Sequence, residues 1–498
     1  MAEYGYILTL DQGTSSTKAG LIDVFGRVFS SAQIRIRQTF PKTGWVEQNP
    51  WEILNSAVEA IDSLLEKSRV KLGDIHSIAI TNQRETVILW DSVSGEPLYD
   101  GIGWQCRRTS AYCQDLIEQG YQEKIQDVTG LPIDPEFSAT KIAWILDHVP
   151  EARIKASKGE VKFGTVDSWL VWNLTNRQFH VTDITNASRT MLLDLDTLQW
   201  SRDMLELFNI PVSILPEIIS SNAVVGKMHK KFLNGESKDI VAVIGDQQAS
   251  LFGQACFEIG MTKCTYGTGA FMLTNTGENR ISNDSGLIQT VAWLIDDKVE
   301  YALEGAVLSA GATVNWALSN LGIAKDVSEL QDLAESVDDS DGVVVVPAFA
   351  GLGSPHWDSS ARASLQGLSF STKKSHIARA ILESTAYQCA DLLEAFSVSS
   401  DIVVNNLRAD GGGAASNFLM QRQADFLRIK VQRSQHIEST MLGAAHLSGL
   451  KVGFWNNIHE LNRLWTQEVE FTPSLDDNEF RLLKDQWNKA ISRSRDWQ

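Results

Sequence analysis

Two short turns rich in glycine and threonine, one near the start of the chain and one about halfway along it, are each enclosed by extended apolar segments. The first turn, DQGTSSTK at residues 11–18, follows the apolar residues 6–10 and leads into residues 19–23. The second, GTG at residues 267–269, lies in the middle of residues 261–273. This order of strand, turn and strand predicts two β-hairpins of the same type. A hairpin that recurs in each half of the chain indicates a duplicated unit.

Both turns have the composition of a phosphate-binding loop. Successive backbone N–H groups and hydroxyls of such a turn point into one concavity, and the carboxylate of Asp11 can hold a hydrated divalent cation. Because turns of this composition are also common as structural connections, the first turn alone leaves both interpretations open. A third glycine-rich turn at residues 410–414 precedes a helix that is expected to begin near Ser416. Helix N-termini and glycines let a nucleotide approach the backbone closely, so the three turns together favour a nucleotide cradle.

The length of 498 residues is too great for one hydrophobic core and predicts at least two large domains. The repeated hairpins predict that a ligand is held in a cleft between two halves. Residues 240–244 have the composition of a buried strand, and the helical segment after them ends near Phe252. We therefore expect an N-terminal domain over residues 1–252, with the first phosphate hairpin, and a C-terminal domain over residues 253–498, with the second.

Composition and motifs exclude several classes of protein. The formal net charge of −18 argues against nucleic acid and against an anionic membrane surface as partners. The sequence contains no signal-peptide pattern and no apolar run of membrane-spanning length. The five cysteines form no Cys-x-x-Cys pair and no paired framework, which predicts reduced thiols in a cytoplasmic protein. The Walker A, dinucleotide-binding, protein-kinase and zinc-protease motifs are absent, so a nucleotide would need a different cradle.

Charged side chains follow two apolar segments at the point where each strand is expected to end. Residues 75–80 lead to Arg84 and Glu85, and residues 240–244 lead to Asp246. An aspartate in such a position is often a helix N-cap, and a surface Arg–Glu pair contributes only about 0–1 kcal/mol. Their position after strands of buried type favours a functional site.

The paired hairpins and the late glycine-rich turn are typical of the actin-like ATPase superfamily, and the chain resembles the FGGY carbohydrate kinases nearly end to end. The motifs that carry this resemblance are DQGT at 11–14, GWVE at 44–47, TNQRET at 81–86, WQCRRT at 104–109, FGTVD at 163–167, TNASRT at 185–190, GDQQ at 245–248, YGTG at 266–269, NFLMQ at 417–421 and a signature that runs from ASLQGL at 363–368 to ILE at 381–383. The resemblance implies an α/β fold of two actin-like (ribonuclease H-like) domains around a central cleft, each with a mixed β-sheet flanked by helices.

The resemblance also implies a function, the ATP-dependent phosphorylation of glycerol to sn-glycerol 3-phosphate in glycerol catabolism, with ATP and Mg²⁺ as cofactors. Arg84 and Glu85 together with Asp246 point to glycerol rather than to a pentulose, and Asp246 would be the general base. The implied substrate-binding residues are Arg84, Glu85, Trp104, Glu136, Asp246, Gln247 and Phe271. The implied nucleotide-binding residues are Thr14, Ser15, Ser16, Lys18, Thr268, Gly311, Asn315, Gly412 and Ser416, and Asp11 would organise the magnesium ion.

Four positions depart from the family pattern. Glu136 stands where a tyrosine usually touches the substrate, and Lys18 replaces an arginine, which keeps the charge but loses the bidentate fork. Near the nucleoside, Asn315 replaces a glutamine and Ser416 replaces an asparagine. The arginine-bearing loop through which some relatives bind fructose 1,6-bisphosphate is not visible between residues 226 and 239, so this regulation is not expected.

Two other functions remain open from the sequence. Glu136 would pair with Arg84 or accept a bond from a further hydroxyl, which suits a kinase for another small polyol or ketose such as erythritol, dihydroxyacetone or a pentulose. A non-catalytic actin-like or chaperone-like ATPase module would explain the hairpins, but it would not explain Arg84, Glu85, Trp104 and Gln247. For the kinases we expect a homodimer or homotetramer in which the domains close on the substrate.

Overall fold

The computed structural model describes residues 5–281, 285–436 and 438–497, and the chain divides into two compact units. The first unit contains the chain up to Ala255 together with Gln289–Tyr301 and Ser439–Leu464. The second unit contains Cys256–Ile288, Ala302–Glu438 and the chain from Trp465 onward. The chain thus first leaves the first unit close to the boundary expected at residue 252, and it returns to that unit twice.

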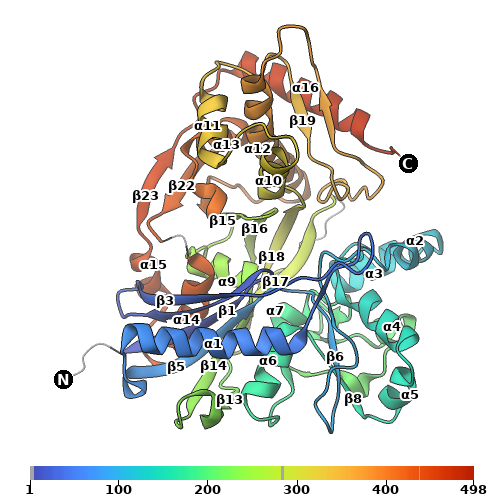
Figure 1. Ribbon diagram of the computed structural model, residues 1–498, viewed down its shortest axis with the longest axis vertical. Coiled ribbons are helices and arrows are strands. Elements are labelled where there is room, and N and C mark those ends of the chain that lie inside the picture. Colours follow the sequence, from blue (N-terminus) through green and yellow to red (C-terminus); the bar gives the residue numbers. More distant parts are fainter. Residues whose placement is uncertain (1–4, 282–284, 437, 498) are drawn as a thin grey trace. The chain divides into compact units, whose positions relative to one another are not determined.

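The first unit is built on a mixed six-stranded sheet with the strand order β13-β14-β5-β1-β2-β3 (Figure 1). Its strands are β1 (Tyr6–Gln12), β2 (Ser16–Ile22), β3 (Val28–Arg35), β5 (Ile75–Asn82), β13 (Gly226–Met228) and β14 (Lys238–Gly245). The pair β1 and β2 forms the predicted hairpin, and β3 continues it in antiparallel order. Because β5 lies parallel to both β1 and β14, these three strands have their carboxyl ends at one edge of the sheet.

One long helix covers β2 and β3 of this sheet. Helix α1 (Pro50–Ser68) begins where the side chain of Asn49 accepts hydrogen bonds from the backbone N–H groups of Trp51 and Glu52. Such a cap satisfies donors that the first turn of a helix leaves without partners. The apolar face of α1 is buried and contributes to the same hydrophobic core as the sheet.

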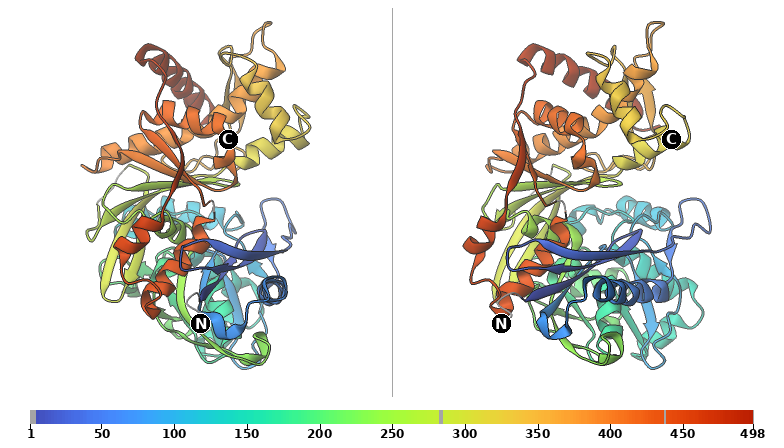
Figure 2. Two further views of the ribbon diagram at one scale, coloured as in Figure 1. Left: turned by 90° about the vertical axis from the view of Figure 1, so that its left-hand side faces the viewer. Right: turned by 60° about the vertical axis from the view of Figure 1, so that its left-hand side comes forward.

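A helix from the late part of the chain packs into the first unit. Helix α14 (Ser439–Val452) contacts α9 (Asp246–Gly253) and the strands β1, β5 and β14, and Figure 2 shows its orange-red ribbon beside the blue strands. Two glycines allow the helices to touch. A Cβ atom on Gly253 would lie 1.9 Å from Ser439 O, and one on Gly443 would lie 1.8 Å from Ala249 O.

The remaining elements of the first unit are short helices and strand pairs. The helices are α2 (Ser110–Glu118), α3 (Gln122–Thr129), α4 (Ser138–His148), α5 (Ala152–Ser157), α6 (Val166–Leu174), α7 (Ile184–Ala187), α8 (Arg202–Leu207) and α15 (Ile458–Leu464). The paired strands are β4 (Glu47–Gln48) with β7 (Gly101–Ile102), β6 (Ile88–Asp91) with β8 (Val161–Gly164), β9 (Val181–Asp183) with β12 (Glu217–Ile219), and β10 (Leu193–Asp194) with β11 (Gln199–Trp200).

A seven-stranded mixed sheet with the order β17-β18-β16-β15-β21-β22-β23 contains the main strands of the second unit, and also most of β17 and the start of β18, which belong to the segment Gln289–Tyr301 of the first unit. Its strands are β15 (Thr262–Tyr266), β16 (Ala270–Gly277), β17 (Ile288–Ile295), β18 (Lys298–Val307), β21 (Asn406–Asp410), β22 (Lys430–Ser434) and β23 (Gln467–Phe471). The pair β15 and β16 forms the second predicted hairpin, and β15 lies parallel to β21. The same order, a hairpin whose first strand runs parallel to a later strand, occurs in the first unit with β1, β2 and β5.

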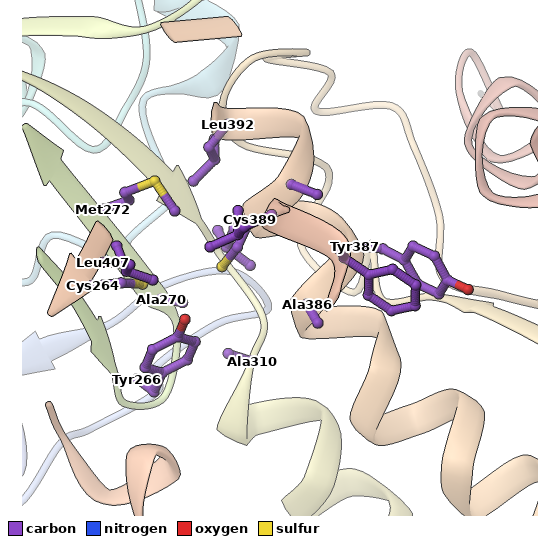
Figure 3. Close-up of a cluster of buried hydrophobic side chains, with 14 of the residues drawn as sticks. Cys264, Tyr266, Ala270, Met272, Ala310, Ala386, Tyr387, Cys389, Leu392 and Leu407 are labelled. Atoms are coloured by element: carbon purple, nitrogen blue, oxygen red, sulfur yellow. The ribbon is translucent and has the colours of Figure 1, made fainter. Parts of the chain in front are cut away.

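Helices flank this second sheet. They are α10 (Gly311–Ser319), α11 (Val327–Glu335), α12 (Lys374–Ser399), α13 (Asn417–Leu427) and α16 (Asp477–Ser494), and a small pair of strands, β19 (Val344–Val346) and β20 (Ser364–Gln366), completes the unit. Figure 3 shows Cys264 and Met272 of the sheet directed toward Cys389 and Leu392 of α12, and all four side chains are buried. The expected fold, two α/β units that each have a mixed sheet and flanking helices, is confirmed.

All five cysteines lie within the described part of the chain, where they are buried and form no disulfide, as the sequence predicted. Burial raises the pKa of both Cys113 and Cys256 to about 12, so these thiols stay protonated at neutral pH. Among the described residues, no helix is long and apolar enough to cross a membrane.

Candidate active site

The parallel strands of the first unit bring several sequence-predicted residues to one edge of its sheet. The register places Asp11 of β1 beside Thr81 of β5, and Thr81 beside Ile244 of β14. Arg84 therefore follows β5, and Asp246 follows β14, at the same carboxyl edge. This convergence explains why residues far apart in the sequence can act on one ligand.

Arg84 and Asp246 contact each other directly. Arg84 Nε lies 3.3 Å from Asp246 Oδ1, and Arg84 Nη1 donates a hydrogen bond to Gln248 Oε1 at 3.2 Å. The side chain of Arg84 is only 3% exposed, whereas that of Asp246 is 26% exposed. A buried guanidinium thus fixes a carboxylate that solvent and a ligand can still reach, which is the arrangement that a general base requires.

The backbone just before Asp246 is connected through hydrogen bonds to the buried carboxylate of Asp183. Asp246 is the first residue of α9, and the N–H of Gly245 before it donates to Thr185 Oγ1 at 2.8 Å. Thr185 Oγ1 in turn donates to Asp183 Oδ1 at 2.9 Å. Burial and, secondarily, the charge of Asp167 raise the pKa of Asp183 to about 6. This chain of hydrogen bonds holds the end of β14 in place.

Glu85 has an unusual backbone conformation and a strong ionic partner. Its φ angle is +62°, in the left-handed region that non-glycine residues seldom adopt, and such conformations cluster at functional sites. Glu85 Oε1 accepts a hydrogen bond from Arg189 Nε at 2.6 Å and lies 3.8 Å from Arg84 Nε. No role for Arg189 is predicted from the sequence, although this residue lies in the TNASRT motif.

Glu136, which departs from the family pattern, is buried beside two cations. Its Oε1 lies 3.6 Å from Arg189 Nη2, and its backbone carbonyl accepts a hydrogen bond from Lys141 Nζ. Burial lowers the pKa of Lys141 to about 8, while Glu85 and Glu136 act in the opposite direction. Lys141 was also not anticipated from the sequence, because a lysine in a helical segment is usually exposed.

Trp104 is held against the first hairpin. Its Nε1 donates to Thr14 Oγ1 at 3.0 Å. The loop that carries Trp104 is fixed by Arg108, whose Nη2 lies 2.6 Å from Glu47 Oε1 and whose guanidinium stacks 3.9 Å from the ring centroid of Trp45. The two resemblance motifs GWVE and WQCRRT therefore form one structural support for the indole ring.

The turn of the first hairpin is compact and remains accessible. The N–H of Gly13 donates to Ser16 O at 2.9 Å, and Asp11 lies opposite Lys18 in the register of β1 and β2. Ser15 is exposed at the tip. No group of three or more His, Cys, Asp or Glu side chains suited to a metal occurs among the described residues. Mg²⁺ in kinases is usually held by one or two carboxylates together with phosphate oxygens, so the single carboxylate of Asp11 fits such an ion.

A cavity of about 620 Å³ lies within the second unit, which is a volume typical of small-ligand sites. Five residues that the sequence assigned to the nucleotide line it, namely Thr268, Gly311, Asn315, Gly412 and Ser416. Lining residues that were not assigned to the nucleotide from the sequence include Tyr266, Gln331, Asp332, Leu382 and Thr385.

Glycines shape this cavity. A Cβ atom on Gly311 would lie 2.6 Å from Gly267 O, so the close approach of α10 to the turn of the second hairpin requires glycine. A Cβ atom on Gly412 would meet no atom within 4 Å, so that position opens onto free space. Phe271, which the sequence assigned to the substrate, lies on β16 opposite Thr265 and is half-buried.

Each unit thus carries a mixed sheet with a phosphate-type hairpin, the first with a fixed, accessible carboxylate and the second with a cavity of nucleotide size. This combination defines a kinase of the actin-like ATPase type. The model for the N-terminal domain of the FGGY family of carbohydrate kinases matches residues 6–253, and the model for the C-terminal domain matches residues 262–451. The chain belongs to the FGGY family of carbohydrate kinases.

Several known proteins are similar to the chain over nearly its whole length. A glycerol kinase of Caldanaerobacter subterraneus is 48% identical over 492 residues, and glycerol kinase 2 of Thermotoga maritima is 49% identical over 493 residues, with 99% of each chain covered in both cases. The crystal structure of Plasmodium falciparum glycerol kinase with ADP has a TM-score of 0.90 and 38% identity, and covers 98% of both chains.

Proposed function

We propose that this chain catalyses the phosphorylation of glycerol by ATP, with sn-glycerol 3-phosphate and ADP as products. The observation that carries the proposal is the ion pair of buried Arg84 with partly exposed Asp246 at the strand ends, 3.3 Å apart, next to Glu85. The relatives described above, which are named glycerol kinases and match the full length, support glycerol over a longer polyol or a pentulose.

Asp246 would act as the general base. A hydroxyl oxygen of glycerol attacks the γ-phosphorus of ATP, its proton passes to Asp246, and the bond from the γ-phosphorus to the oxygen of the departing ADP breaks. Arg84, whose Nε lies 3.3 Å from Asp246 Oδ1, would stabilise the carboxylate before the proton arrives.

The other residues of the first unit would bind and orient glycerol. Arg84, Glu85 and Gln247 offer donors and acceptors for its remaining hydroxyls. Trp104 would form an apolar wall for the carbon chain, and we propose that Phe271 of the second unit contributes to the same wall. Glu136 would add an acceptor beside Glu85. When a hydroxyl is held in this way, binding energy offsets much of the entropic cost of bringing the reacting groups together before the chemical step.

ATP would be held by both hairpins and by the cavity of the second unit. Thr14, Ser15, Ser16, Lys18 and Thr268 would contact the phosphates, whereas Gly311, Asn315, Gly412 and Ser416 would lie along the nucleoside. Asp11 would hold a hydrated Mg²⁺ ion, which, when bound, neutralises charge on the phosphate oxygens. The polyol site would then belong to the N-terminal domain and the adenosine site to the C-terminal domain.

Two further expectations concern the protein in the cell. The five cysteines are buried and form no disulfide within the described residues, which suits a reducing compartment, so we propose that the enzyme works in the cytoplasm. The family resemblance implies a homodimer or homotetramer, which analytical ultracentrifugation of the purified protein would measure.

The deciding experiment is a coupled ADP-release assay with glycerol, erythritol, dihydroxyacetone or no polyol. We expect the highest kcat/KM with glycerol and little ATP turnover without an acceptor. A higher kcat/KM with erythritol would identify a kinase of another polyol and would give Glu136 the role of an extra hydroxyl acceptor. ATP hydrolysis at the same rate with and without polyol would instead identify an ATPase module.

A further inference from the structure

Charged side chains of alternating sign form a series in the interior of the first unit. Asp246 lies 3.3 Å from Arg84, Arg84 lies 3.8 Å from Glu85, Glu85 lies 2.6 Å from Arg189, and Arg189 lies 3.6 Å from Glu136. Apart from Asp246, none of these side chains is more than 4% exposed. Water therefore screens these interactions little, and each charge depends on its neighbours in the series.

Arg189 lies between two carboxylates of this series and interacts with both, those of Glu85 and Glu136. Its side chain is fully buried, its Nε donates to Glu85, and its Nη2 faces Glu136. The planar guanidinium presents its donors in a fixed fork, so the two carboxylates are fixed relative to each other. A lysine would offer the same charge from a single point and could not impose this geometry.

We propose that Arg189 is a positioning residue of the polyol site, which acts by orienting Glu85, an assignment that rests on the proposed glycerol kinase activity. Glu85 lies 2.6 Å from Arg189 and 3.8 Å from Arg84, and the buried Lys141 also interacts with it electrostatically. Without Arg189, the Glu85 carboxylate turns toward Arg84. Arg84 then shares its donors more strongly with Glu85 and less with Asp246, so both glycerol binding and the orientation of the base are affected.

The proposal has a quantitative consequence that a purely structural role lacks. Charge-assisted hydrogen bonds contribute about 1.5–3 kcal/mol, so Arg189→Gln should lower kcat/KM for glycerol about ten- to a hundredfold. The KM for ATP should stay within about twofold, because the cavity of the second unit is untouched. Since Arg189 acts through Glu85, Arg189→Gln should add little to the loss already caused by Glu85→Gln.

The experiment is a double-mutant cycle with wild type, Arg189→Gln, Glu85→Gln and the double variant. Steady-state kinetics with glycerol and with ATP are measured for each protein, together with thermal unfolding. Arg189→Lys is included as the variant that keeps the charge and the fold if the glutamine variant unfolds, and its glycerol KM should also rise. Arg379→Lys is the matched control, because Arg379 also donates from Nε to a buried carboxylate, that of Glu383, at 3.0 Å.

Non-additive losses in kcat/KM for glycerol, with unchanged KM for ATP, support the assignment. Additive losses, or equal rises in both KM values that follow the loss of thermal stability and recur in Arg379→Lys, overturn it while leaving the proposed function intact. A wild-type protein that neither binds glycerol in calorimetry nor phosphorylates it overturns the proposed function and this assignment together.

Discussion

Replacing Asp246 by asparagine should separate the chemical step from substrate binding. Asp246 Oδ1 lies 3.3 Å from Arg84 Nε and accepts a hydrogen bond from the N–H of Gln247 at 2.7 Å. Asparagine has nearly the same shape as aspartate, so its side-chain oxygen can keep both contacts. It cannot take a proton from the attacking hydroxyl at neutral pH. The variant therefore loses the base and keeps most of the contacts that shape the site.

The size of the effect follows from these contacts. Loss of a general base lowers the rate by a factor of about 10²–10⁴, which corresponds to about 2.7–5.5 kcal/mol of activation free energy. The effect on binding is smaller, because Arg84 keeps Glu85 as an acidic neighbour at 3.8 Å and because the carboxylate of Asp246 is 26% exposed and partly screened. We expect kcat to fall by two to four decades, while the affinity for glycerol changes less than about tenfold.

Turnover is measured by coupled ADP release, and glycerol affinity by calorimetry without ATP. The control is Asp23→Asn, because Asp23 is also a largely buried carboxylate of the first unit, paired with Arg27 at 2.8 Å, but it lies at the opposite end of β2 from the phosphate turn. A kcat for Asp246→Asn within about threefold of wild type would remove Asp246 from the role of base. A parallel loss of glycerol binding and kcat would make it a ligand instead.

Three further substitutions test other parts of the site. Arg84→Ala should raise the glycerol KM about ten- to a hundredfold by removing charge-assisted hydrogen bonds, and an unchanged KM in steady-state kinetics would move the polyol site elsewhere. Gly412→Val should raise the KM for ATP without loss of thermal stability, because its Cβ would meet free space. Gly411→Ala should instead lower the melting temperature, because Gly411 has φ +81° and a Cβ would lie 2.6 Å from Tyr266 O. Equal changes in melting temperature for the two variants would contradict this expectation. Lys141 has a pKa of about 8 in the folded protein and an ordinary value of 10.5 in the unfolded chain, so the unfolded chain binds more protons between pH 8 and pH 10.5. The free energy of unfolding should therefore rise with pH across this window by up to about 3 kcal/mol in wild type but not in Lys141→Met. Urea denaturation that gives the same pH dependence of the unfolding free energy for both proteins would refute this.

The hairpins could be predicted from sequence because a turn and its flanking strands are close together in the chain. The return of residues 439–464 to the first unit could not be predicted in this way. It depends on the contact between α9 and α14, where Gly253 and Gly443 each admit the backbone of the other helix. Each glycine alone resembles an ordinary helix-weakening residue, and only the packed structure gives the pair its meaning.

The residues of the candidate site also differ in whether they could be predicted from the sequence. Arg84, Glu85 and Asp246 could be predicted because each follows an apolar strand, and parallel strands gather such ends at one edge. Arg189 and Lys141 could not, since a charged residue in or beside a helix is normally solvated. Their burial is decided by tertiary packing that brings oppositely charged groups, 104 residues apart in the case of Arg189 and Glu85, into contact.

The buried charges of this site are better explained by ligand binding than by stability. A left-handed backbone at a residue such as Glu85 costs about 1–3 kcal/mol, and a buried ion pair often contributes no more to folding than apolar side chains of the same volume. Folding alone would therefore not favour the pair of Glu85 and Arg189, which is 2.6 Å apart and almost free of water contact. A small polyol has hydroxyls that must each give up water in the site. Charged groups that already hold one another in place can bind those hydroxyls without first reorganising. The free energy that the strained backbone and the buried charges cost in folding thus makes ligand binding more selective.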